Sequence, residues 1–412
     1  MAGSRRIVAC LLLGLFASST IAAPVVADVE WEADGWLTTA LADERLTSGD
    51  EFGCYGVPGY SWYNDPGAVA KECRSYIENN TDASKWGANA LSTYAPDGLT
   101  MAQHNYIASQ DFVVHGDGTG LIESAWHDAD DAPNDVWDWY NLGRRGGSLE
   151  KEIGSLETVQ TAVEEGGLVN LYWIGRVNDA TIRHDRDIAN YLQNDAEAWM
   201  TTWGQAWSYW TSNRCYEHSN LLDENASTFT FSSIVTEQCT NLAPNAWDVP
   251  ATWRLSFENA TIVDVQDVFG QSMTNLTNER QTAEGWRMDG DELLVSVKRG
   301  TIVTVVLQGE NVSFDVHNQT KFWNGYDAAV TIAAHDTTDL FLWSKRFDDE
   351  DQMRFTWLVS PRTVEGQLPW LPYAALVAGL VTVVAMMGIL GREGIGPLAG
   401  VMNNKNVHYE EE

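Results

Sequence analysis

The chain has 412 residues, and 58 acidic against 25 basic side chains give it a formal net charge of −33 at pH 7. Its 19 Trp residues and 11% aromatic content exclude an intrinsically disordered acidic chain, because disordered acidic segments lack aromatic side chains. No nucleic acid is expected among its partners. The combination is typical of proteins that fold in molar salt, where the Debye length falls to about 3 Å and self-repulsion is screened.

Residues 1–27 have the pattern of an export signal. Arg5 and Arg6 precede an apolar run from Ile7 to Phe16, and small residues lead to Ala27. The paired arginines leave both the general secretory route and the twin-arginine route open. We therefore expect an exported chain whose folded part lies outside the cell or outside a viral particle.

Residues 28–215 are predicted to form a mixed N-terminal ectodomain whose first part is rich in loops. Four cysteines follow the predicted signal: Cys54, Cys73, Cys215 and Cys239. An even number of cysteines in an oxidising compartment predicts disulfides, and four cysteines allow three pairings. Short loops favour the pairs Cys54 with Cys73 and Cys215 with Cys239, so that the first bond staples the N-terminal region.

Residues 148–210 are predicted to contain two long helices. Apolar residues recur at helical spacing over 148–165, and a second helix is expected from about Asp185 through Trp210. Four tryptophans would lie along one face of this second helix: Trp199, Trp203, Trp207 and Trp210. The stripe has three interpretations, which are core packing, membrane contact and a surface for a sugar or a partner. Core packing is the interpretation we favour.

The segment between these helices, residues 166–175, is uncharged and has glycine at both ends. A segment of this composition is able to enter the interface of a bilayer. The candidate membrane-interacting residues are Leu168, Leu171, Tyr172, Trp173 and Ile174. The alternative is a buried strand or a buried connection between helices.

Residues 216–367 are predicted to form a β-rich, membrane-proximal domain of the β-sandwich type. Short β-branched or aromatic runs, such as 252–257, 301–307, 328–333 and 354–359, alternate with turn residues. The chain also carries acceptor motifs for N-glycosylation, at Asn79, Asn225, Asn259, Asn275, Asn311 and Asn318. Most of these motifs fall in the β-rich part, which would then present a glycan-bearing surface.

Residues 371–390 carry no charge and match the length of about 20 apolar residues that a single membrane-spanning helix requires. Residues 391–412 would then form a short inner tail. The predicted fold class is therefore α+β, with a mixed, disulfide-stapled N-terminal region, central long helices, a C-terminal β-sandwich-like region and a single C-terminal transmembrane helix. The expected location is a membrane, with the ectodomain outside.

A search for catalytic motifs finds no nucleophile elbow, no zinc-protease helix, no phosphate loop and no dinucleotide fingerprint. We therefore predict no enzymatic activity, no catalytic residues and no cofactor. Two stretches, His115-Gly116-Asp117-Gly118 and residues 127–131, contain groups that ligate divalent ions, but neither has the spacing of a calcium loop. Solvated acidic turns are the favoured interpretation of both, and no metal site is predicted.

The layout of the whole chain resembles the spike glycoproteins of the pleomorphic, membrane-enveloped viruses of haloarchaea. The resemblance rests on the export signal, the four cysteines after it and the apolar segment 371–390. It implies anchoring in a viral envelope, or in an archaeal cell membrane if the gene is the host's, with the ectodomain outside. It also implies attachment to a host cell and fusion of the viral envelope with the host membrane. The implied partners are a lipid bilayer and a receptor, surface-layer protein or glycan of the host cell, and the spike is a possible homo-oligomer.

Two other classes of protein remain open. A resident surface protein of a haloarchaeon, either structural or ligand-binding, would use clusters such as Trp137 and Trp139 to stack on sugars. An anchored extracellular hydrolase is the less favoured alternative, since the chain shows no catalytic motif.

Overall fold

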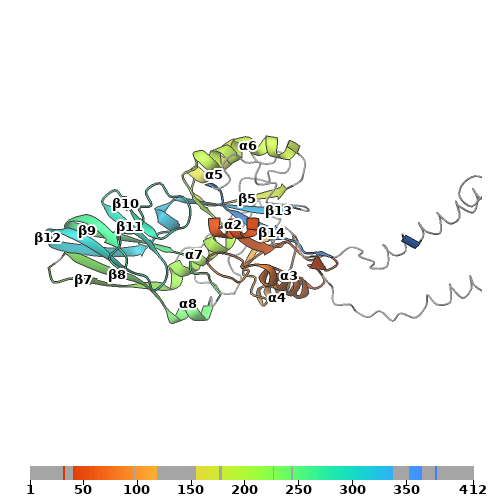
Figure 1. The fold of residues 1–412 in the computed structure, drawn as a ribbon, viewed down its shortest axis with the longest axis horizontal. Coiled ribbons are helices and arrows are strands. Elements are labelled where there is room, and N and C mark those ends of the chain that lie inside the picture. Colours follow the sequence, from red (N-terminus) through yellow and green to blue (C-terminus); the bar gives the residue numbers. More distant parts are fainter. Residues whose placement is uncertain are drawn as a thin grey trace, which may run out of the picture. The chain divides into compact units, whose positions relative to one another are not determined.

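The computed structural model describes residues 31–32, 40–96, 98–117, 155–175, 179–225, 227–242, 245–336, 352–363 and 376–377 (Figure 1). Several predicted features lie outside these residues: the export signal, residues 127–131, Trp137, Trp139, nearly all of 371–390 and the tail 391–412. Within the described part of the chain, no helix combines the length and the apolar character that a membrane span needs.

The predicted α+β class is wrong, because the chain forms one parallel sheet flanked by helices and one antiparallel sheet. The parallel strands are β2 (Glu51–Cys54), β3 (Ser92–Ala95), β4 (Val114–Asp117), β5 (Gly167–Gly175), β13 (Ala328–Asp336) and β14 (Phe355–Val359), and the short strand β6 (Trp199–Thr201) also pairs with β13. A mixed α/β fold therefore replaces the expected sequence of loops, helices and sandwich.

The parallel sheet has the strand order β4-β3-β2-β14-β13-β5. In chain order, β2, β3 and β4 run from the centre of the sheet to one edge. Strands β5, β13 and β14 then run from the other edge back to the centre, where β14 pairs with β2. Because each step then leads in the same direction around the sheet, right-handed connections place their helices on one face. This cyclic order is that of an opened barrel, and we call the element the half-barrel.

Helices cover the outer face of the half-barrel: α2 (Ala40–Ser48), α3 (Pro66–Asn80), α4 (Met101–Ala108) and α5 (Leu156–Glu164). Helix α3 begins where Asp65 accepts a hydrogen bond from the backbone of Ala68, and Pro66 fits the first turn. Its Cys73 is bonded to Cys54 of β2, which holds the helix against the sheet.

The concave face of the half-barrel is filled by Trp203, the first residue of α7 (Trp203–Cys215). The indole Nε1 of Trp203 donates to Oδ1 of Asn170 on β5 at 2.9 Å. Thr331 of β13 donates to the same oxygen at 2.9 Å. Gly116 of β4 leaves room for the indole, because a Cβ at this position would overlap the six-membered ring of Trp203.

The predicted helix over 185–210 is wrong. Helix α6 (Asp179–Asn194) ends first, β6 follows, and α7 starts after Thr202, whose side chain accepts a hydrogen bond from the backbone of Gln205. This capping bond favours a new helix start over a continuous helix. The four tryptophans of the predicted stripe are all buried, so core packing is confirmed, although Trp199 belongs to β6.

The antiparallel sheet is inserted between β6 and β13. It has the order β10-β11-β9-β12-β8-β7 and consists of β7 (Tyr216–Leu222), β8 (Thr228–Val235), β9 (Ala251–Gln266), β10 (Gly285–Asp289), β11 (Glu292–Val297) and β12 (Ile302–Gln319). The expected two-sheet sandwich at the C-terminal side is therefore wrong. There is one sheet, and the predicted strands near 328–333 and 354–359 belong to the half-barrel instead.

The two longest antiparallel strands change direction at Asn259 of β9 and Asn311 of β12, which have φ of 57° and 55°. The pairing register shifts between Gly309 and Ser313 beside them. Residues on both sides of this kink share one apolar core, so the single sheet encloses its own interior. The core consists of Phe229, Phe231, Trp253, Leu255, Val265, Leu293, Val295, Val297, Val303, Val305 and Leu307.

Both predicted disulfides are confirmed. Cys54 is bonded to Cys73, and Cys215 is bonded to Cys239 of α8 (Glu237–Leu242), the helix that follows β8. The remaining elements are a one-turn helix, η1 (Trp323–Gly325), and a separate pair of short strands, β1 (Trp31–Glu32) and β15 (Arg362–Thr363).

Candidate functional site

The carboxyl ends of the half-barrel strands carry a group of rings. Parallel sheets flanked by helices bind their ligands at this edge, where the loops after the strands meet. Four residues supply the rings, and we call them the carboxyl-edge cluster: Tyr55 directly after β2, Tyr94 of β3, Tyr172 of β5 and His335 of β13. They come from four strands that are distant in the sequence.

The rings of the carboxyl-edge cluster are in contact with one another. The imidazole of His335 stacks on Tyr55, with 3.5 Å between the ring centroids and an interplanar angle of 16°. Tyr55 in turn stacks on Tyr94 at 5.0 Å. The ring centroids of Tyr94 and Tyr172 are 5.9 Å apart. The four side chains therefore form one continuous aromatic group.

Strand alternation places this cluster on the concave face. Side chains two residues apart in a strand point to the same side of the sheet. Asn170 and Thr331 are hydrogen-bonded to each other on the concave face. Tyr172 lies two residues beyond Asn170, and His335 four residues beyond Thr331, so both occupy the same face nearer the carboxyl edge.

His335 contains an unusual polar atom. The residue is only 8% exposed, and its Nδ1 is buried with no hydrogen-bond partner among the described residues. Burial lowers the pKa of His335 to about 4, so the imidazole is neutral at pH 7. A buried polar atom without a partner costs free energy, so a hydroxyl or amide group that reached Nδ1 after a small movement of its neighbours would be stabilised there.

A buried carboxylate lies at the opposite, amino end of the half-barrel. Oε2 of Glu51 accepts hydrogen bonds from the hydroxyl of Thr202 at 2.9 Å and from the backbone N–H of Gly204 at 2.8 Å. Burial raises the pKa of Glu51 to about 7. The bonds tie β2 to the first turn of α7, so this group has a structural role.

The stretch His115-Gly116-Asp117 forms β4, and the interpretation as a solvated turn is wrong. The Nε2 of His115 donates to the carbonyl of Phe112 at 2.8 Å, so its Nδ1 accepts from Nδ1 of His104 at 2.9 Å. Burial lowers the pKa of His115 to about 3, which keeps this imidazole neutral. Within the described ranges, no three His, Cys, Asp or Glu side chains are grouped as metal ligands would be.

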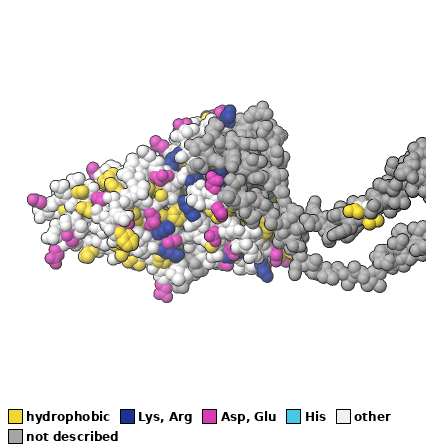
Figure 2. Space-filling view, viewed as in Figure 1, with side chains coloured by type: hydrophobic (Ala, Val, Ile, Leu, Met, Phe, Trp, Pro, Cys, Tyr) yellow, Lys and Arg dark blue, Asp and Glu magenta, His cyan; other side chains and the backbone are white. Residues whose placement is uncertain are grey.

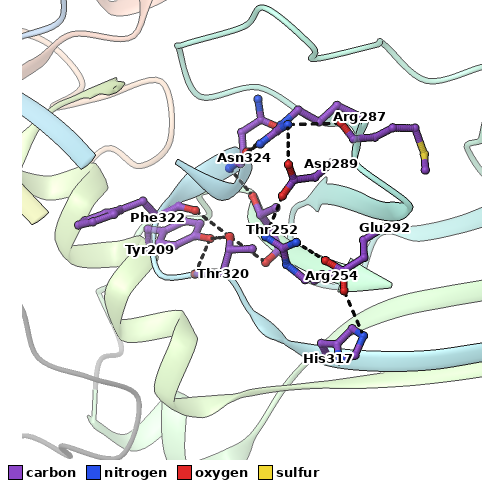
Figure 3. Close-up of polar contacts among 11 residues, drawn as sticks. Tyr209, Thr252, Arg254, Arg287, Asp289, Glu292, His317, Thr320, Phe322 and Asn324 are labelled. Atoms are coloured by element: carbon purple, nitrogen blue, oxygen red, sulfur yellow. Dashed lines mark hydrogen bonds and ion pairs between the residues drawn. The ribbon is translucent and has the colours of Figure 1, made fainter. Parts of the chain in front are cut away.

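A pocket of about 560 Å³ lies on the antiparallel sheet, and we call it the β12 pocket. It is lined by Arg254, Val316, His317, Asn318, Gln319, Thr320, Lys321, Gly325, Tyr326 and Asp327. Figure 3 shows the charged groups at one side of it. Arg254 donates to Glu292 and lies 3.0 Å from Asp289, while Glu292 lies 3.6 Å from His317.

The segment between β12 and β13 forms one wall of the β12 pocket and is held by buried hydrogen bonds (Figure 3). The backbone N–H of Asn324 donates to the hydroxyl of Thr252 at 2.8 Å. Arg287 donates to the carbonyl of Asn324 from two nitrogens, at 2.9 and 2.8 Å. The hydroxyl of Tyr209, on α7, bonds to Thr320. The wall is therefore fixed to the antiparallel sheet and to α7.

The predicted membrane-interacting segment is β5. Leu168, Leu171 and Tyr172 are buried, and the strand pairs with β13 along its whole length. The chain folds as the buried strand that the sequence offered as the alternative. Contact of this segment with a bilayer would require β5 to leave the half-barrel.

All the predicted glycosylation sites have exposed asparagines. Asn79 lies on α3, Asn225 in the turn after β7 and Asn275 beside Trp286 of β10, whereas Asn259 lies on β9 and Asn311 and Asn318 lie on β12. Figure 2 shows Asp and Glu side chains spread over the described surface. The surface is thus acidic and accessible to glycosylation.

The carboxyl-edge cluster was not among the sequence-based candidates. A possible signal was the position of Tyr55 and His335 at or just past the ends of short apolar runs, where parallel strands expose their ligand-binding residues. No family model, no curated protein and no solved structure matches this chain.

Proposed function

We propose that this chain is an exported surface protein of a halophile that binds a carbohydrate at the carboxyl-edge cluster. One observation carries the proposal: the cluster joins stacked rings to the buried Nδ1 of His335, which has no partner among the described residues. Rings stack on the apolar face of a sugar, and a neutral imidazole bonds to its hydroxyls. Both chemistries are present at one edge of the half-barrel.

Molar salt weakens a binding site made of charged groups more than a site made of neutral rings and hydrogen-bonding groups. Ion pairs near a surface weaken as ionic strength rises, because the counterions screen them. Stacking and hydrogen bonds between neutral groups do not depend on a net charge, and His335 is neutral at pH 7. Glycoside hydrolysis needs a pair of carboxylates, which the four residues of the cluster do not supply. Binding is therefore proposed without hydrolysis.

The attachment role implied by the resemblance to viral spikes is compatible with this proposal, since a host glycan would be the ligand. The fusion role has no support in the described residues, because its candidate segment is the buried strand β5. A resident surface protein that binds a neighbouring glycan would use the same site.

We expect neutral oligosaccharides to quench the tryptophan fluorescence of the full chain saturably in molar salt. His335→Gln should weaken the binding at least about tenfold, which corresponds to the loss of one buried hydrogen bond. His218→Gln is the matched control, because His218 lies on β7 of the antiparallel sheet, outside the cluster and outside the β12 pocket. It should leave the affinity unchanged.

The affinity should also be constant between pH 6 and pH 8 and fall as the pH approaches about 4, where His335 becomes protonated. Circular dichroism at each pH confirms that the chain is folded. No saturation by any oligosaccharide in a broad panel would overturn the proposal. Equal affinities of the His335→Gln variant and the unmodified chain would remove His335 from the site.

A further inference from the structure

We propose that the β12 pocket holds the first sugar residue of a glycan attached to Asn318. Asn318 is exposed and lines the pocket, and it begins the acceptor motif Asn318-Gln319-Thr320. None of the other five acceptor asparagines is among the residues that line this pocket. The side chain of Asn318 makes no hydrogen bond within the described residues, so its amide nitrogen is available for attachment.

The chemistry of the pocket suits a neutral sugar. Lys321 and Asp327 are both exposed and make no ion pair in the described part of the chain. One supplies hydrogen-bond donors and the other supplies acceptors, while their charges balance. A polyhydroxylated ring, whose hydroxyls both donate and accept, bonds to such a pair without the cost of burying a net charge.

Gln319, which lines the pocket, carries a buried acceptor. Its Nε2 donates to Oγ of Ser212 at 2.9 Å and to the carbonyl of Tyr209, so its amide is fixed in orientation. Its Oε1 is buried with no partner among the described residues, and the residue is 8% exposed. Because this oxygen has no exposed surface, a sugar hydroxyl in the pocket would reach it only after a small movement of its neighbours. Tyr326 adds a ring, whose own hydroxyl donates to the carbonyl of Glu279 at 2.9 Å.

Size and tethering favour the same occupant. The β12 pocket is open to solvent and has a volume of about 560 Å³, and pockets for small ligands typically have volumes of about 300–1,000 Å³. A covalent link at Asn318 would keep the sugar at an effective concentration in the millimolar range or above. Weak contacts with Lys321 and Asp327 then suffice to hold the sugar in place.

A thermodynamic cycle tests this inference. The full chain is produced in a haloarchaeal host that glycosylates exported proteins, and glycopeptide mass spectrometry determines which acceptor sites carry sugar. Thermal unfolding in molar salt is then measured for the unmodified chain, Asn318→Gln, Lys321→Ala and the double variant. We expect Asn318→Gln to lower Tm by about 2–4 °C. Lys321→Ala should lower Tm in the glycosylated chain and have no further effect in the Asn318→Gln background.

Asn225→Gln is the matched control, because Asn225 is exposed in the turn between β7 and β8 and lies outside the pocket. Its shift in Tm should add to that of Lys321→Ala. An unmodified Asn318, or additive shifts for Asn318→Gln and Lys321→Ala, would overturn the inference. The inference is independent of the carboxyl-edge cluster, whose saccharide binding is measured by fluorescence, so either proposal can fail without the other.

Discussion

Glu51→Gln is expected to raise the free energy of unfolding at pH 8 by on the order of 3 kcal/mol, and by much less at pH 5. Burial raises the pKa of Glu51 from 4.5 to about 7, so the folded state binds more protons than the unfolded state between these values. The stabilisation is therefore complete below pH 4.5 and is lost as the pH rises through 7. Glutamine removes the ionised form and keeps an oxygen that accepts from Thr202 and Gly204.

Urea unfolding in molar salt at pH 5 and pH 8 measures this effect. Glu217→Gln is the control, because Glu217 is exposed on β7 and should change the free energy of unfolding little at either pH. A Glu51→Gln variant that is destabilised at pH 8 would show that the ionised carboxylate is stabilised by Thr202 and Gly204. The pKa of Glu51 in the folded state would then have to lie below 7.

The pH dependence of the whole chain combines this group with two histidines that act in the opposite direction. Burial lowers the pKa of His335 to about 4 and that of His115 to about 3, below the ordinary value of 6.5. Their contribution to stability is complete above pH 6.5 and is lost as the pH falls toward 4 and 3. The histidine contributions are complete at pH 6.5, while that of Glu51 is still falling there, so stability should be highest near pH 6.5 and decline on both sides. Glu51→Gln should remove the decline on the alkaline side.

The sequence predicted local features correctly and failed where distant segments pair. Cysteine spacing predicted both disulfides, since the short loops place each pair close together. The runs near 328–333 and 354–359 were recognised as strands but assigned to a sandwich. They pair with β5 and β2 across long stretches of chain, and parallel strands buried on both faces show no alternation that would identify their partners.

The predicted tryptophan helix failed for a related reason. Trp199 and Trp203 are four residues apart, which is helical spacing, but Thr202 caps a new helix between them. The burial of both side chains was nevertheless predicted correctly, because large aromatic rings are buried whether they lie on a strand or on a helix. The carboxyl-edge cluster was out of reach, since its four residues share no sequence motif and meet only when the half-barrel closes.

Gly116→Ala is expected to destabilise the chain by about 1–3 kcal/mol, because the added methyl group overlaps the indole of Trp203. Gly67→Ala is the control, since the nearest atom to its added methyl group would be 3.9 Å away. Trp203→Phe alone should also destabilise, through the smaller ring and the loss of the bond to Asn170. In the double variant the smaller ring makes room for the methyl group. The double variant should therefore lose less stability than the sum of the losses in the two single variants.

Urea unfolding and saccharide titration connect this packing to the proposed site. Both are measured for the unmodified chain, Gly116→Ala, Trp203→Phe and the double variant. Trp203 fills the concave face that Tyr172 and His335 share, so the proposed ligand would be confined to the carboxyl edge. The double variant should therefore recover saccharide affinity together with stability. Additive losses of stability would show that the ring of Trp203 moves freely away from Gly116. Movement of Trp203 would then open space on the concave face, and the proposed ligand would contact Asn170 directly.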